Sequence, residues 1–279
     1  MPPSSRTRST TSATRRASSS STRCASGSAA ASRTPTAEGA EPSGFLLERL
    51  LYRDGLILVI DKPAGLPVHA GPGGGPNLED YLDELRFGLP KPPALAHRLD
   101  RDTSGCLILG RHRKALARLG RLFAGGRIAK TYWAVVRGRP PRPAGRIDLP
   151  LAKVTADRRS WRMQVEAGGR PAVTDYRVVG STDGLSWLEL RPRTGRTHQL
   201  RVHLAALGCP IVGDVVYGRP EEDGLLPLHL HARAVRIPLY PGRDPIHVEA
   251  PPPGHLLDLL RACGYAPSNR PSRSRSPVA

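Results

Sequence analysis

Residues 97–105 bring together the side-chain types that acid–base or nucleophilic chemistry needs. Their first six positions carry two carboxylates, two guanidiniums and one imidazole. A carboxylate held beside arginine keeps a low pKa and stays ionised, which suits a nucleophile better than a proton donor. The alternative is a surface turn in which Asp102 caps the backbone and Arg98 pairs with Asp100, because structural ion pairs are common. The residue types alone leave both interpretations open.

Residues 193–203 form a second polar segment, which is basic and spaced like the start of a helix. His198 and Arg201 stand three positions apart and therefore share one face of the predicted helix, whose other side is apolar. Arg196 stands where that helix begins, and the free backbone N–H groups there also favour an anion. The segment either binds phosphate or carboxylate groups or is a solvated basic helix face.

Residues 130–136 place aromatic side chains beside a lysine in a stretch rich in β-branched residues, which predicts a strand. Side chains alternate between the two faces of a strand, so Tyr132 and Trp133 lie on opposite faces. One of these rings either faces a cleft, where it can stack on a base, or packs in the core.

A metal site is the weakest of the candidates. His229 and His231 are two positions apart and would share a face if this segment were a strand, but no third Cys, His or carboxylate has convincing spacing. His198 and His203, five positions apart, point about 140° from each other around a helix and make a poor pair. The four cysteines are far apart in the sequence. These spacings indicate neither a metal site nor a disulfide framework.

Apolar periodicity predicts the elements that position these segments. Apolar or β-branched runs predict strands, and apolar residues at helical spacing, with Asn77 and Thr197 as N-caps, predict helices. The strands outnumber the helices and cluster in pairs, without regular βαβ alternation. We therefore predict an α+β fold with a mixed, mostly antiparallel sheet and flanking helices. The predicted strands span residues 56–60, 106–109, 131–136, 173–179, 185–190 and 235–239, and the helices residues 78–85, 116–122, 198–207 and 256–263.

The chain is basic in its body as well as at its ends. It has 42 Lys and Arg against 24 Asp and Glu, a formal net charge of +18 in 279 residues. Residues 1–43 and 267–279 contribute +4 and +3, so the intervening body keeps +11. This charge indicates a polyanionic partner. No apolar run approaches the roughly 18 residues of a membrane span, and the scattered cysteines fit a reducing compartment. We therefore expect a cytoplasmic protein without membrane spans.

Both ends have a composition that does not support a folded core. Residues 1–44 are dominated by Ser, Thr, Ala and Arg, and residues 267–279 by Pro, Ser and Arg. Such segments bury too little apolar surface to offset the entropy of ordering, so we predict disorder there. The first segment resembles a transit peptide without a clear amphipathic helix, and a start codon placed too far upstream explains it equally well. Residues 45–266 are predicted to form one domain.

The three polar segments, taken in order, resemble the RluA-type family of RNA pseudouridine synthases. They are His97-Arg98-Leu99-Asp100 with Thr103-Ser104-Gly105, then Lys130-Thr131-Tyr132, then Thr194 to His203. The flanking motifs Asp61-Lys62-Pro63-Ala64-Gly65-Leu66, Gly208 to Asp214 and Leu228 to Ala232 agree with the family as well. This ordered set spans residues 50–250 and favours chemistry at Asp100 over a surface turn.

The resemblance implies a role for each residue of the predicted site. Asp100 is expected to be the catalytic aspartate, Tyr132 the aromatic residue that packs against the target base, and Arg201 the arginine that pairs with the aspartate. Arg98 is expected to fill the space that a flipped nucleotide leaves. Further contacts to the substrate are expected from His97, Lys130, Arg196 and His198.

The resemblance also implies the function of the domain. Residues 45–266 are expected to adopt the pseudouridine synthase catalytic fold with a basic central cleft, as in the single-domain subgroup that lacks an S4 domain. The expected activity is isomerisation of uridine in structured RNA, either tRNA or a 23S rRNA stem-loop, by a monomer that needs no metal and no nucleotide cofactor. Two alternatives remain: a non-catalytic RNA-binding or ribosome-assembly protein, and a metal-dependent nuclease built on His229 and His231.

Overall fold

The computed structural model of this protein describes residues 44–71, 73–154 and 161–267. The disorder predicted for residues 1–44 and 267–279 therefore concerns segments that lie outside the described residues, except for one residue at the inner end of each. Within the described part of the chain, no helix is both long enough and apolar enough to cross a membrane.

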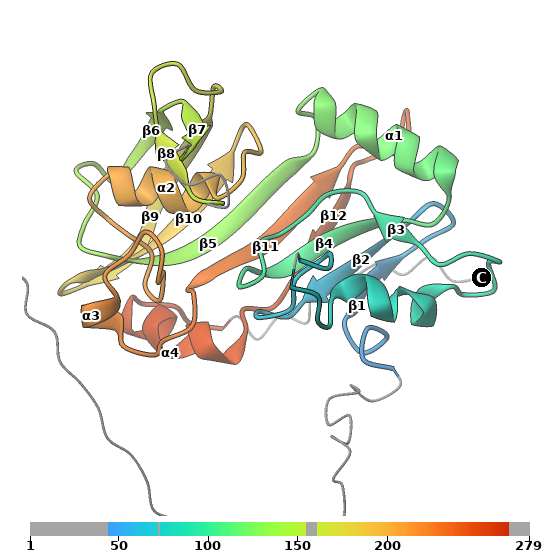
Figure 1. Cartoon of the computed structure of the whole chain (residues 1–279), viewed down its shortest axis with the longest axis horizontal. Coiled ribbons are helices and arrows are strands. Elements are labelled where there is room, and N and C mark those ends of the chain that lie inside the picture. The colour runs from blue at the N-terminus through green and yellow to red at the C-terminus, as the bar shows by residue number, and fades with distance from the viewer. Residues whose placement is uncertain (1–43, 72, 155–160, 268–279) are drawn as a thin grey trace, which may run out of the picture. The chain divides into compact units, whose positions relative to one another are not determined.

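One large sheet organises the described residues (Figure 1). Its ten strands are β1 (Leu50–Arg53), β2 (Ile57–Lys62), β3 (Ala94–Leu95), β4 (Ser104–Gly110), β5 (Ala129–Arg137), β6 (Ala144–Asp148), β9 (Val173–Thr182), β10 (Leu185–Pro192), β11 (Leu230–Ile237) and β12 (Ile246–Glu249). Eight of them follow the order β1-β2-β4-β11-β5-β10-β9-β6, while β12 pairs with β11 and β3 with β4. Among these pairings only β4 and β11 run parallel. The predicted mixed, mostly antiparallel sheet is confirmed.

The remaining elements pack around this sheet. A separate two-stranded ribbon consists of β7 (Leu151–Lys153) and β8 (Met163–Val165). The helices are η1, a 3₁₀-helix (Leu78–Leu85), α1 (Arg113–Ala124), α2 (Gln199–Ala206), α3 (Pro220–Asp223) and α4 (Gly254–Ala262). Figure 1 shows α1 above the right-hand part of the sheet and α4 below its left-hand part, with the long strands β5 and β11 running diagonally between them.

The central strands are buried on both faces. Along β4, Cys106 and Ile108 belong to the cluster that α1 covers, whereas Leu107 and Leu109 belong to the cluster on the other face, which η1 and α2 cover. This alternation follows from the two-residue period of a strand. Strand β5 shows the same division, with Tyr132 on the face of η1 and α2 and Val135 packed beside α4. The helices therefore flank the sheet on both sides, as predicted.

Two details of the predicted helices are corrected. Residues 78–85 form a 3₁₀-helix, and Asn77 is its N-cap as predicted. Thr197 is not the N-cap of α2, because His198 occupies that position and the helix begins at Gln199. The side chain of Gln199 instead orders the turn before the helix: its Oε1 accepts hydrogen bonds from the Thr194 hydroxyl at 2.7 Å and from the Arg196 amide at 3.0 Å.

Gly105 fixes the point where the polar segment 97–105 enters the sheet. Its φ is +105°, and a Cβ atom there would lie 2.3 Å from the carbonyl oxygen of Ala232. Only glycine permits both the backbone conformation and this close approach. The parallel register of β4 and β11 pairs Gly105 with Ala232, so the segment meets the middle of the sheet at one defined position.

Candidate active site

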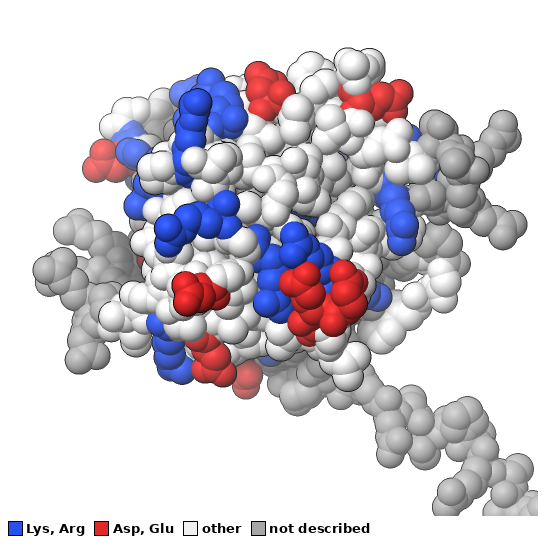
Figure 2. Space-filling view, turned by 90° about the vertical axis from the view of Figure 1, so that its left-hand side faces the viewer, with Lys and Arg blue, Asp and Glu red and all other residues white. Residues whose placement is uncertain are grey.

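A basic cleft of about 920 Å³ lies beside the segment 97–105. Among the described residues that line it, Asp100 is the single carboxylate, and the basic side chains are Arg98, Lys130, Arg191, Arg193, Arg196, Arg201 and Arg236. On the side of the molecule that carries β6, β9 and β10, basic and acidic side chains are instead intermixed (Figure 2), and Asp175 there pairs with both Arg146 and Arg193. Of the basic side chains in the cleft, Arg191, Arg193 and Arg201 pair with acidic residues outside it. Positive charge that has no ion pair among the described residues remains there on Arg98, Lys130, Arg196 and Arg236.

Asp100 lies on a short turn at the edge of this cleft. Leu99 before it is buried, and the amide of Thr103 donates to the Asp100 carbonyl oxygen at 3.2 Å. The side chain of Asp100 is 20% exposed. The alternative of a surface turn, with Arg98 paired to Asp100, is not observed. Asp102 pairs with its neighbour Arg101 at 3.0 Å, and Asp100 lines the cleft.

Lys62 holds the backbone next to Asp100. Its ammonium is fully buried and donates to the carbonyl oxygens of Pro63, Leu66 and Arg101 at 2.7, 2.7 and 2.9 Å. Burial lowers the pKa of Lys62 to about 8, against the opposing charges of Asp102 and Asp100. Three carbonyl dipoles converge on this buried charge, as a buried ammonium requires. The lysine thereby ties the loop after β2 to the turn that carries Asp100.

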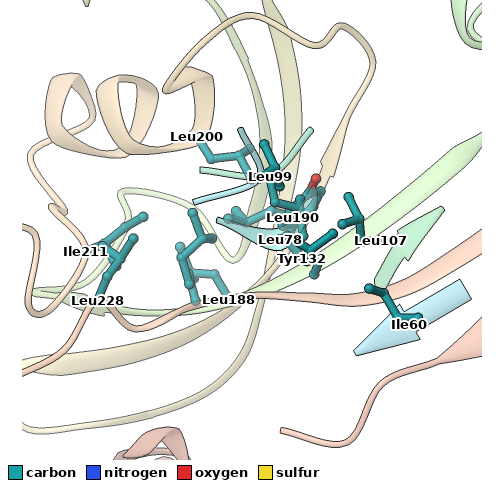
Figure 3. Close-up of a cluster of buried hydrophobic side chains, with 14 of the residues drawn as sticks. Ile60, Leu78, Leu99, Leu107, Tyr132, Leu188, Leu190, Leu200, Ile211 and Leu228 are labelled. Carbon is teal, nitrogen blue, oxygen red and sulfur yellow. The ribbon is translucent and has the colours of Figure 1, made fainter. Parts of the chain in front are cut away.

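Tyr132 contributes a buried aromatic ring to the cleft. It is 9% exposed and lies among Leu78, Leu99 and Leu190 (Figure 3). Burial, reinforced by the charge of Asp100, raises the pKa of Tyr132, so its hydroxyl stays protonated at neutral pH. Lys130, two positions earlier on β5, also lines the cleft, and burial lowers its pKa. One strand therefore supplies both the ring and an ammonium.

Arg201 pairs with Asp214, which corrects the expected pairing with Asp100. Its Nε and Nη2 atoms lie 2.7 and 2.6 Å from the two carboxylate oxygens of Asp214. The two side chains are 6% and 1% exposed. Burial alone would lower the pKa of Arg201, but the hydrogen bonds and charge of Asp214 raise it, with a smaller contribution from Asp100. Asp100 is thus an electrostatic neighbour of Arg201, while Asp214 is its direct partner.

His198 lies between Asp100 and a tyrosine that the sequence did not single out. Its Nε2 atom is 3.9 Å from Asp100 Oδ2, and its Nδ1 atom is 2.8 Å from the hydroxyl oxygen of Tyr217. Trp161 packs edge-to-face against the imidazole, with 5.2 Å between ring centroids. Burial lowers the pKa of His198, with the charges of Asp100 and Arg201 acting in opposite directions.

His97 lines the cleft but is fixed by the protein itself. Its Nε2 atom accepts a hydrogen bond from the backbone amide of Ile108 at 3.0 Å, and its ring packs on Phe123 with 4.9 Å between centroids. Burial and the charge of Lys130 lower the pKa of His97 to about 3, so the ring is neutral. Because Nε2 already has a partner inside the protein, a substrate contact from His97, which stays a prediction, would use another part of the ring.

The two remaining predicted contacts, Arg98 and Arg196, both line the cleft. Arg98 is exposed, and its guanidinium has no ion pair within the part of the chain that the structure describes. Arg196 lies just before α2, where its Nε donates to the carbonyl oxygen of Pro171 at 3.0 Å. Both guanidiniums thus keep donor groups directed at solvent or substrate.

The histidine pair suggested as metal ligands is used for internal hydrogen bonds. His231 contacts the Ser104 hydroxyl and the Ala250 carbonyl oxygen at 2.9 and 3.2 Å, and His229 contacts the Pro227 carbonyl oxygen at 2.7 Å. The described residues contain no group of three or more His, Cys, Asp or Glu that could hold a metal ion. The nuclease alternative therefore has no supporting geometry.

Sequence reasoning missed Asp214, Tyr217 and Lys62 as parts of this site. Asp214 Oδ1 accepts hydrogen bonds from the amides of Val216 and Tyr217, both at 3.0 Å, which sets the turn that brings the Tyr217 ring to His198. Asp214 and Lys62 stood in motifs that matched the family, but the motifs did not say what these side chains contact.

A partly enclosed aspartate beside a buried aromatic ring, in a cleft that is otherwise basic, defines an enzyme site for an anionic substrate. The family model for RNA pseudouridylate synthase matches residues 56–206. This chain belongs to the RluA-type RNA pseudouridine synthases, which are isomerases acting on uridines in RNA.

Individual relatives agree with this assignment. The chain is 44% identical over 215 residues to an uncharacterised RNA pseudouridine synthase of Zymomonas mobilis, covering 77% of this chain and 98% of that one. It is 35% identical over 213 residues to ribosomal large subunit pseudouridine synthase C of Buchnera aphidicola, covering 74% and 68%. The solved structure of human RNA pseudouridylate synthase domain containing 4 superposes with a TM-score of 0.67 and 29% identity, covering 79% of this chain and 95% of that one.

Proposed function

We propose that this protein isomerises specific uridines of structured RNA, in tRNA or in a stem-loop of large-subunit rRNA, with Asp100 as its catalytic residue. The observation that carries the proposal is the position of Asp100, the single carboxylate among the described residues of a basic cleft, with a buried aromatic ring and a buried arginine near it. The surrounding positive charge supports the binding of RNA phosphates.

The proposed chemistry is redox-neutral. The C1′–N1 bond of the uridine breaks, the uracil rotates, and a C1′–C5 bond forms. An ionised Asp100 can attack uracil C6 or C1′, or take a proton from C2′ on a glycal route. A uridine in a stem-loop must leave its stack to reach the cleft, so base flipping is part of the proposal. Tyr132 packs against the flipped base, and Arg98 occupies the space that the base vacates.

The name of one relative suggests which RNA to test first. The Buchnera relative is named for the large ribosomal subunit, which makes rRNA the first substrate to test here. Relatives from Xenopus and Arabidopsis are named as mitochondrial. For this protein a cytoplasmic location and a monomeric state stay predictions, to be checked by fractionation and by light scattering.

The decisive experiment combines mapping with one substitution. Site-resolved pseudouridine mapping of total RNA from a deletion strain should show at least one missing pseudouridine, restored by the wild-type gene. Asp100→Asn should bind the identified RNA with unchanged affinity and form no pseudouridine, because the amide keeps the shape but cannot act as a nucleophile. Isomerisation by this variant would refute the role of Asp100. An unchanged pseudouridine map in the deletion strain would instead favour the non-catalytic RNA-binding alternative.

A further inference from the structure

His198 has an unusual backbone for its position. Its φ and ψ are 51° and 18°, in the left-handed region, and among the described residues that are not glycine only Phe87 shares a positive φ. The residue stands at the N-cap of α2, yet its side chain caps no amide of that helix. Strained conformations of this kind persist where the surrounding structure fixes them, and they gather at functional sites. The imidazole is therefore directed to a task other than capping.

The contacts of Tyr217 determine which nitrogen of His198 carries the proton. The Tyr217 hydroxyl oxygen accepts a hydrogen bond from the amide of Met163 at 2.9 Å, so its own O–H is left to donate to His198 Nδ1, 2.8 Å away. Burial raises the pKa of Tyr217, which keeps that hydroxyl protonated. Since Nδ1 accepts, the proton of the neutral imidazole is on Nε2.

This Nε2–H group faces the cleft without a partner. It lies 3.9 Å from Asp100 Oδ2, too far for a hydrogen bond. No other acceptor for it occurs within the described residues, although the His198 side chain is only 10% exposed. Unlike the unpartnered buried nitrogens of Trp187 and His229, the Nε2 atom of His198 is accessible, so it can donate to an acceptor that enters the cleft. Its position beside the catalytic carboxylate points to a partner on the substrate.

We propose that His198 Nε2–H donates a hydrogen bond to the uracil of the flipped uridine and stabilises the negative charge that develops on that ring. This inference rests on the proposed function of the site. When the C1′–N1 bond breaks, its electron pair stays with the uracil. C5 then donates a pair to C1′, the C5 proton leaves, and N1 takes up a proton. His198 keeps its own proton throughout and acts only as a fixed donor.

Negative charge develops on the uracil in each route open to Asp100. Departure of the base from C1′ or through a glycal leaves a uracil anion with charge on its nitrogen and carbonyl oxygens. Attack on C6 places the charge on C5 and the adjacent carbonyl. A donor that is oriented before the reaction stabilises any of these charges without reorganisation, and loss of one such donor slows comparable reactions by about 100-fold or more.

The test compares three variants on the RNA segment that mapping identifies. His198→Leu removes the donor and should slow single-turnover pseudouridine formation about 100-fold without weakening RNA binding. His198→Gln places an amide N–H near the position of Nε2 and should stay within about 10-fold of wild type. Tyr217→Phe removes the hydroxyl that fixes the tautomer and should fall between the two. His112→Asn, which preserves the N-cap of α1 outside the cleft, should leave the rate unchanged.

A second substrate separates charge stabilisation from a structural effect. In RNA carrying 5-fluorouridine at the target, the fluorine stabilises the uracil anion, so cleavage of the C1′–N1 bond depends less on the donor. C5 there carries fluorine in place of the proton that leaves, so the rate measured on this RNA is the loss of N1-linked 5-fluorouridine rather than the formation of pseudouridine. The defect of His198→Leu should shrink to under about 10-fold on this RNA. Equal defects on both RNAs, or a wild-type rate with uridine, would overturn the inference. If His198→Leu fails to fold by circular dichroism, the same comparison is made with Tyr217→Phe. Failure of the wild-type enzyme to isomerise any RNA would refute the proposed function instead.

Discussion

The guanidinium of Arg201 is held in two places by the carboxylate of Asp214. Nε and Nη2 donate at 2.7 and 2.6 Å to separate oxygens, in the parallel geometry that makes arginine–carboxylate pairs strong. Asp214 also binds two backbone amides, so every interaction of this carboxylate is internal to the protein. Arg201 is therefore positioned before substrate arrives, and its charge acts on Asp100 from a fixed place.

Because Arg201 and Asp214 form a buried ion pair, we expect that substitutions can restore stability without restoring activity. Asp214→Asn strands the buried charge of Arg201 and should lower the free energy of unfolding by about 3–5 kcal/mol, with loss of activity. The double variant Asp214→Asn/Arg201→Met removes both charges and should recover much of that stability while staying inactive. Urea denaturation and a pseudouridine assay on the same preparations check this. Activity in the stable double variant would show that the arginine is not needed.

The sequence predicted the sheet well because its strands follow two simple patterns. Continuous apolar runs mark β2 and β4, which are buried on both faces, and the paired runs of β9 and β10 form the expected antiparallel hairpin. The prediction missed the short strands β1, β3, β6, β7, β8 and β12, and it placed the start of β11 near Val235 rather than at Leu230. A bulge between His231 and Ala234 interrupts its register with β5, and such a bulge disturbs the alternation on which the prediction depends.

The site was predicted less completely because side-chain partners depend on tertiary contacts. The sequence does not show which carboxylate Arg201 contacts. Its pairing with Asp214 depends on the turn after Asp214, and the Asp214 carboxylate itself stabilises that turn. His97 was predicted to contact the substrate, yet its Nε2 atom accepts a hydrogen bond from the backbone amide of Ile108 in the neighbouring strand. Motif matching located both residues correctly but could not reveal these bonds.

His97 should therefore act on stability in a pH-dependent way. The unfolded imidazole takes up a proton below about pH 6.5, whereas the folded ring, with its pKa lowered to about 3, does not. Between about pH 3 and pH 6.5 the unfolded state therefore binds more protons than the folded state. The contribution of His97 to the free energy of unfolding is lost as the pH falls across this range. His97→Gln should be more destabilising at pH 7.5 than at pH 4.5, as measured by urea denaturation. A pH-independent difference would mean that the ring is protonated in the fold.

Asp61 should have the opposite effect on stability: its contribution to the free energy of unfolding falls as the pH rises. Burial raises its pKa to about 6, with a smaller opposing effect of Arg49. Between about pH 4 and 6 the folded state binds the extra proton, so stability from this group is lost as the pH rises. Asp61→Asn should then raise the free energy of unfolding by about 1–2 kcal/mol at pH 7.5 and change it little at pH 4. Asp244→Asn, at an exposed position, is the matched control, and an equal gain in both variants would argue against burial as the cause.

Arg236 tests whether the cleft extends the RNA contact beyond the reacting uridine. It is exposed on β11, lines the cleft beside His247, and has no ion pair within the residues that the structure describes. If it contacts one phosphate, Arg236→Gln should weaken RNA binding and reduce the slope of log affinity against log salt by about 0.7–0.9. The rate of the bound complex should not change, because Arg236 does not touch the reacting base. Lys114→Gln removes one positive charge from the exposed side of α1 and should leave the slope unaltered. Equal slopes for both variants would place the RNA away from this end of the cleft.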